Sequence, residues 1–150
     1  MIVKNIKKIF LALLLIISFA ACNNKEAEEI LMANIMEVHD DLMKKGDNIM
    51  QNKESLNKLL ASTANADSAS ASLDTENFHQ RVNLLNKDLT MADEAMMNWM
   101  NNFNPNFDGK THEQIIAYLN KQQAEILKVE LKTEKALKTS NAFLEKHIKK

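Results

Sequence analysis

Residues that most folds need for turns and cross-links are scarce in this chain. Its 150 residues include 2 Gly, 1 Pro and 1 Cys. One cysteine excludes a disulfide scaffold and a cysteine zinc site, and two glycines exclude a glycine-rich phosphate loop. Strand-rich folds are also disfavoured because their many turns depend on Gly and Pro. With 19 Lys and Arg against 20 Asp and Glu, no positive excess argues for nucleic acid as a partner. These absences favour an all-α protein.

The chain begins with the pattern of a bacterial signal peptide. Three lysines, Lys4, Lys7 and Lys8, precede an uncharged apolar run over residues 9–21. This run is shorter than the roughly 20 apolar residues that a permanent membrane-spanning helix needs. We therefore expect residues 1–21 to be a cleaved leader.

The only cysteine, Cys22, follows this apolar run directly. The stretch from Ser18 to Cys22 resembles a bacterial lipobox, although Phe19 stands where Leu, Val or Ile is usual. The resemblance implies that Cys22 carries lipid and becomes the mature N-terminus, and two or more acyl chains anchor a protein stably. Residues 22–29 are polar and acidic and are expected to form a tether. This composition is similar to the signal that sends lipoproteins of Bacteroidetes-type bacteria to the cell surface, so we expect an outer-membrane or surface protein.

The remaining chain has the periodicity of three long helices. Apolar residues recur at helical spacing from about Ala27 to Leu60, where Gly46 suggests a kink or break. Residues 61–72 are small and polar and are expected to form a linker or a frayed helical turn.

The second helix is expected to begin near Asp74 and to end before Pro105, since proline disfavours helix at the preceding residue. Its apolar seam alternates steps of four and three residues, the spacing of helices packed side by side. The seam consists of Phe78, Val82, Leu85, Leu89, Ala92, Met96, Trp99 and Phe103.

Thr111 followed by Gln114 predicts a capping box that opens the third helix. The seam of this helix consists of Ile115, Leu119, Ile126, Val129, Ala136 and Phe143, interrupted by Gln122, Thr133 and Ser140. The predicted fold is an elongated antiparallel three-helix bundle over residues 30–150, with four helices if the chain breaks at Gly46.

Methionines and one histidine are expected to gather in one layer of this bundle. Folding the first two helices back on each other sets residues 37–43 opposite residues 93–99, with His39 on the apolar face. One interpretation is ordinary packing, in which methionine fills the core and His39 hydrogen-bonds a carboxylate such as Asp93. The other is a Cu(I) site, because thioether and imidazole are ligands for soft metals. The candidate ligands are Met36, His39, Met43, Met96 and Met100.

Other catalytic or cofactor patterns are weak. Glu76 and His79 form a single Glu-x-x-His, whereas a di-iron bundle needs two such motifs. His79, His112 and His147 are expected to be solvated. No nucleophile, zinc-protease or Walker motif occurs, so we expect a protein that is not an enzyme and that has no cofactor other than the copper alternative.

Three parts of the sequence together resemble a group of short Bacteroidetes lipoproteins of unknown function, often given the automatic name "viral A-type inclusion protein". These are His39-Asp40-x-x-Met43, Asp93-Glu-Ala-Met-Met-x-Trp-Met100 with Phe103, and Tyr118-Leu119. The resemblance implies an envelope lipoprotein and no specific activity. The predicted function is a lipid-anchored, non-catalytic interaction or structural module that binds an envelope protein or its own copies. The alternative is a small copper-binding lipoprotein.

Overall fold

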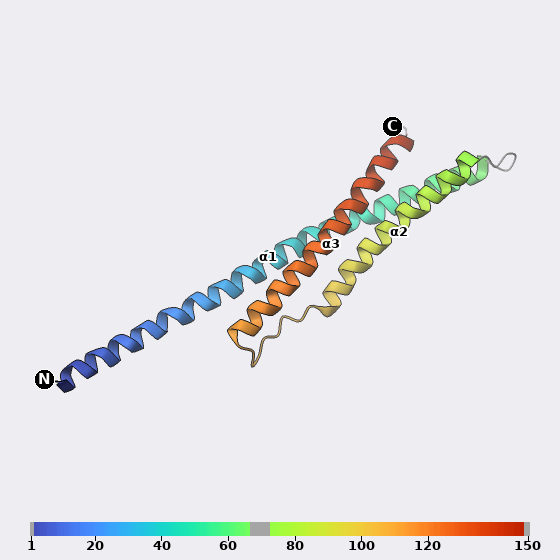
Figure 1. Ribbon diagram of the computed structural model, residues 1–150. Coiled ribbons are helices and arrows are strands. Elements are labelled where there is room, and N and C mark those ends of the chain that lie inside the picture. The colour runs from blue at the N-terminus through green and yellow to red at the C-terminus, as the bar shows by residue number, and fades with distance from the viewer. Residues whose placement is uncertain (1, 67–72, 149–150) are drawn as a thin grey trace.

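The protein consists of three helices packed together, as a computed structural model shows (Figure 1). The structure describes the backbone of residues 2–66 and 73–148, and the side chains of residues 25–63 and 76–148. Helix α1 spans Ile2–Ala66, α2 spans Leu73–Asn102 and α3 spans His112–His147. The described residues contain no strand, so the predicted all-α class is confirmed.

Helices α1 and α2 run in opposite directions. Asn57 bonds Asn86 at 2.9 Å, and Thr63, further along α1, bonds His79, which comes earlier in α2, at 2.8 Å. The chain therefore turns back between the two helices. Residues 61–66 of the predicted linker are helical and belong to α1, and residues 67–72 lie outside the described residues.

Helix α3 runs in the same direction as α1. Lys45 contacts Glu134 at 3.1 Å, and Asn52, seven residues further along α1, contacts Asn141, seven residues further along α3, at 2.6 Å. The N-terminal part of α1 extends beyond the ends of the other two helices (Figure 1).

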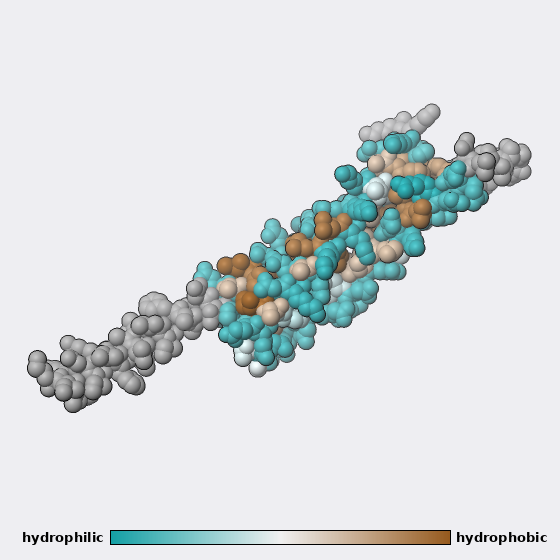
Figure 2. All heavy atoms as spheres, viewed as in Figure 1, coloured by the Kyte–Doolittle hydropathy of each residue, from teal (hydrophilic) through white to brown (hydrophobic). Residues whose placement is uncertain are grey.

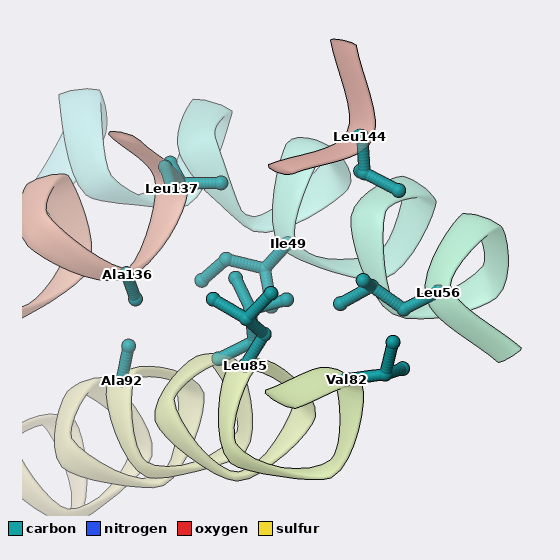
Figure 3. Packing of buried hydrophobic residues seen from close by; sticks show 9 residues of the cluster. Ile49, Leu56, Val82, Leu85, Ala92, Ala136, Leu137 and Leu144 are labelled. Carbon is teal, nitrogen blue, oxygen red and sulfur yellow. The ribbon is translucent and has the colours of Figure 1, made fainter. Parts of the chain in front are cut away.

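The core follows the predicted seams. Every seam residue of α2 from Val82 to Trp99 is buried, and all three polar interruptions of α3 are buried as well. Leu56 and Val82 point toward each other, as do Ala92 and Ala136 (Figure 3). Helix α1 contributes one residue every seven positions, namely Ile35, Leu42, Ile49 and Leu56. This strict heptad repeat is the pattern of helices packed at a shallow angle.

The chain does not break at Gly46, so the four-helix alternative is wrong. Helix α1 continues through this residue, so the bundle has three helices and not four. Its neighbours Leu42 and Ile49 are both buried in the core, and this packing keeps the helix intact across the glycine. A single glycine costs a helix only about 1 kcal/mol relative to alanine, which such packing readily offsets.

The connection between α2 and α3 contains a glycine turn and the predicted capping box. Gly109 adopts a φ of 73°, a left-handed conformation that side chains disfavour. The hydroxyl of Thr111 accepts a hydrogen bond from the backbone N–H of Gln114, whose side chain accepts one from the backbone N–H of Thr111. The predicted capping box is therefore confirmed.

Residues 25–29 of the predicted tether are helical and belong to α1. Glu28 Oε1 lies 2.7 Å from His112 Nδ1, and both side chains are partly buried. The N-terminal end of the bundle is thus joined to the start of α3. The predicted leader, residues 1–21, and the side chain of Cys22 lie outside the described side chains. In the part of the chain that the structure describes, no helix is apolar over a sufficient length to cross a membrane.

Candidate functional site

The predicted methionine layer is only partly formed. Met96 and Trp99 are buried, but Met36 is 36% and Met43 is 51% exposed, and the His39 side chain retains 21% of its accessible surface. The side of α1 that faces the core carries Ile35 and the residues at seven-residue intervals after it. The methionines of α1 lie beside this row, at the edge of the contact with the other helices. A helix in a three-helix bundle buries only a stripe of its surface, and the predicted apolar face was wider than that stripe.

Some of the candidate ligands line one open groove between α1 and α2. The groove has a volume of about 360 Å³. Its walls are formed by Met32, Met36, His39, Trp99, Met100, Phe103 and Pro105. Three predicted residues, Met36, His39 and Met100, thus come together there.

The other two candidates, Met43 and Met96, line a smaller pocket of about 90 Å³. Met97 and Met100 also line it, so Met100 belongs to both hollows. The five predicted ligands therefore do not form a single cluster. Met32 was missed by sequence reasoning, although it lies four residues before Met36 and seven before His39, on the same side of a helix.

His39 has a different partner from the one expected. Its Nδ1 atom lies 2.9 Å from Oδ1 of Asp40, not of Asp93. An ionised carboxylate only accepts hydrogen bonds, so Nδ1 carries the proton and donates it. In the neutral ring Nε2 then keeps a free lone pair. The His39 ring centre lies 6.0 Å from that of Trp99.

Trp99 forms the inner wall of the groove and is held by stacking. Its ring packs on Phe103 with centroids 4.9 Å apart, and Phe103 in turn lies 6.2 Å from Tyr118 of α3. The hydroxyl of Tyr118 accepts a hydrogen bond from the backbone N–H of Asn104 at 2.7 Å. Within the described residues, the buried Nε1 of Trp99 has no hydrogen-bond partner.

Methionine is distributed unevenly over the helices. Four methionines lie in α1, four lie in α2, and the α3 sequence contains none. We use the term methionine face for those that line the two hollows, namely Met32, Met36, Met43, Met96, Met97 and Met100. Hydrophobic residues occur in several patches along the visible surface, separated by hydrophilic ones (Figure 2).

A charged cluster joins α1 and α3 next to Gly46. Lys45 Nζ lies 2.8 Å from Asp41 Oδ2 and 3.1 Å from Glu134 Oε1. The hydrogen bond to Asp41 raises the pKa of Lys45, and the same bond lowers the pKa of Asp41. Both groups are therefore held in their charged forms.

The other histidines have structural partners. The prediction that His79 and His112 are solvated is wrong, because each is partly buried and bonded, His79 to Thr63 and His112 to Glu28. His147 is exposed as predicted, and its ring lies 4.3 Å from that of Phe143. Among the described side chains, no three His, Cys, Asp or Glu residues gather as a metal cluster would require.

The groove is therefore the larger of the two hollows described above, and its walls combine thioether, imidazole and aromatic groups. None of its lining residues is a carboxylate or a lysine. The chain matches none of the family models, curated proteins or solved structures with which we compared it.

Proposed function

We propose that this protein is a lipid-anchored lipoprotein of the bacterial cell envelope whose helical domain is a non-catalytic docking module. The observation that carries this proposal is the methionine face, with Met43 and Met97 each 51% exposed along one side of α1 and α2. Apolar side chains grouped in hollows on a protein surface are typical of an interaction site.

The anchor is proposed from the leader pattern and the position of Cys22. Glu28 lies six positions after Cys22, and a helix rises 1.5 Å per residue, so Glu28 would lie about 9 Å along the helix from the lipid attachment point. The bond between Glu28 and His112 joins α3 to this same end. The groove would then lie at the membrane-proximal end of the domain, because Pro105 and Phe103 belong to the adjoining connection.

The partner that best fits this surface is an amphipathic helix of another envelope protein. Methionine side chains are flexible and polarizable, so they adapt to different apolar partners. A groove between two helices accepts a third helix through residues spaced three and four apart. The exposed residues of the methionine face would bury their thioethers on such a partner.

Cell fractionation tests the anchor. We expect the protein to remain in the membrane fraction and to incorporate an alkyne-labelled fatty acid. Cys22→Ala should abolish labelling, since it removes the acceptor sulfur. A labelled Cys22→Ala protein, or an unlabelled wild-type protein, would show that the anchor is not a lipid on Cys22.

Photo-crosslinking from single positions tests the docking surface. A photoreactive residue is placed in living cells at Met43 or at Met97, and at Leu131 as a control, which is 67% exposed on α3. We expect one partner to be captured from both methionine positions and not from Leu131. Capture from all three positions, or of different proteins from Met43 and Met97, would count against the proposal. A crosslink to a second copy of the chain would show that the surface binds another copy of this protein and not a helix of a different protein.

A further inference from the structure

We propose that the groove binds one Cu(I) ion through Nε2 of His39 and the thioether sulfurs of Met36 and Met100, beside the ring of Trp99. The ion would be bound by ligand atoms, whereas a partner helix would be bound by apolar contacts. This inference therefore does not depend on the lipid anchor or on docking. It also revises the sequence-based candidate set, because Met43 and Met96 lie in the adjoining pocket.

The hydrogen bonding of His39 suits a metal ligand. Histidines that bind metals usually donate the proton of the second ring nitrogen to a carboxylate, which orients the ring and makes the ligating nitrogen more basic. Asp40 accepts this bond from Nδ1 at 2.9 Å. Within the described part of the chain, Nε2 makes no hydrogen bond, so its lone pair is available.

The two methionines approach His39 from different helices. Met36 precedes His39 by three residues on α1, and residues at this spacing are neighbours on a helix surface. Met100 belongs to α2 and follows Trp99, whose ring centre lies 6.0 Å from that of His39. All three side chains line the same groove, so an ion bound there would bridge α1 and α2.

The lining of the groove favours a soft monovalent ion. Thioether and imidazole ligands select Cu(I), whereas Mg²⁺ and Ca²⁺ require oxygen ligands. None of the lining residues is a carboxylate. The three ligands are neutral, and the carboxylate of Asp40 behind His39 compensates the single positive charge.

Trp99 supplies an aromatic wall beside the ligands. A cation within about 6 Å of an indole ring is attracted by the negative face of the ring. Trp99 is only 6% exposed and is stacked on Phe103, so its ring is held in place without bound metal. It is also the only tryptophan of the chain, which makes its fluorescence a specific reporter of the groove.

The test measures Cu(I) binding to the full-length protein in detergent under anaerobic, reducing conditions, in competition with a chromogenic Cu(I) chelator. We expect one ion per chain. His39→Gln, Met36→Leu and Met100→Leu should each weaken binding by about tenfold or more. Asp40→Ala, which alters no ligand, should weaken it by about 10- to 100-fold, as outer-sphere partners of metal ligands do.

Met50→Leu is the matched control, because Met50 is 71% exposed on α1 and lines neither hollow. Its affinity should equal that of the wild-type protein. Redox-inert Ag(I) should quench the fluorescence of Trp99 at one equivalent, and this quenching should be lost in His39→Gln. Circular dichroism of each variant verifies that the helices are intact.

Three results would overturn the proposal. The first is the absence of competition by the wild-type protein, and the second is unchanged binding by folded His39→Gln. The third is an equal loss of binding in Met50→Leu, which would indicate unspecific thioether binding.

Discussion

Replacing Gly46 by alanine should stabilise the protein, although this glycine lies in the middle of a helix that packs on two others. Helix α1 is continuous at residue 46. A Cβ atom at this position would meet no atom within 4 Å, and the φ of Gly46 is not positive. Alanine therefore fits without displacing a neighbour or straining the backbone.

The magnitude follows from two contributions. Alanine exceeds glycine in helix propensity by about 1 kcal/mol, largely because the unfolded chain loses freedom. Gly46 borders the smaller pocket and is half-buried, so a methyl group there removes some apolar surface from water and adds about 0.4 kcal/mol, half the value of a fully buried methylene. The total of about 1 to 1.5 kcal/mol corresponds to a rise in Tm of about 4 °C for a domain of this size.

Gly109→Ala provides a control of opposite sign. A Cβ atom at Gly109 would also meet no atom within 4 Å, but the φ of this residue is 73°. Alanine in this left-handed conformation costs about 1 kcal/mol. The two substitutions are chemically identical and differ only in the backbone conformation of the glycine.

Urea unfolding of both variants, followed by far-ultraviolet circular dichroism, measures the two free energies. The midpoint should rise for Gly46→Ala and fall for Gly109→Ala, with unchanged slopes. A destabilised Gly46→Ala protein would refute the reasoning, since it would mean that α1 bends at residue 46 or that a neighbour approaches it closely.

Three further outcomes are expected. Thr111→Ala should lower the free energy of unfolding by about 1 kcal/mol in the same urea assay, because it removes the N-cap of α3. In Lys45→Met, the pKa of Asp41, measured by NMR titration, should rise toward 3.8. In the wild type the lowered pKa of Asp41 stabilises the fold at pH values above 3.8. This stabilisation is lost as the pH falls through the lowered pKa. Asn52→Ala should cost about 1 kcal/mol, and a double-mutant cycle with Ser140→Ala should reveal coupling through their 2.8 Å bond.

Helix positions and the seams of α2 and α3 could be predicted because they depend on local patterns. The alternating steps from Val82 to Trp99 and the Thr111 capping box are visible in the sequence and are formed in the structure. The polar residues Thr133 and Ser140 follow the same heptad phase as their apolar neighbours, and both are buried. Ser140 is tolerated there because its hydroxyl donates to the carbonyl of Ala136.

The orientation of α1 could not be predicted as well. Its apolar residues cover a wide part of the helix circumference, which includes both the buried row that begins at Ile35 and the methionines. Only contact with α2 and α3 determines which of these residues are buried. Hydrogen bonds between residues distant in sequence could not be predicted either. The bond between Glu28 and His112 joins residues separated by 84 positions, and no local pattern announces it.

The restriction of methionine to α1 and α2 has a consequence for oxidative damage. Oxidants convert exposed methionine to its sulfoxide, which is polar and chiral. The core of α1 is built from Ile35, Leu42, Ile49 and Leu56, which oxidants leave intact, and α3 contains no methionine to modify. Peroxide would therefore change the methionine face from apolar to polar while most of the core continues to hold the helices together. Methionine sulfoxide reductases reverse this change. Oxidation would therefore alter the polarity of this surface reversibly without unfolding the helices.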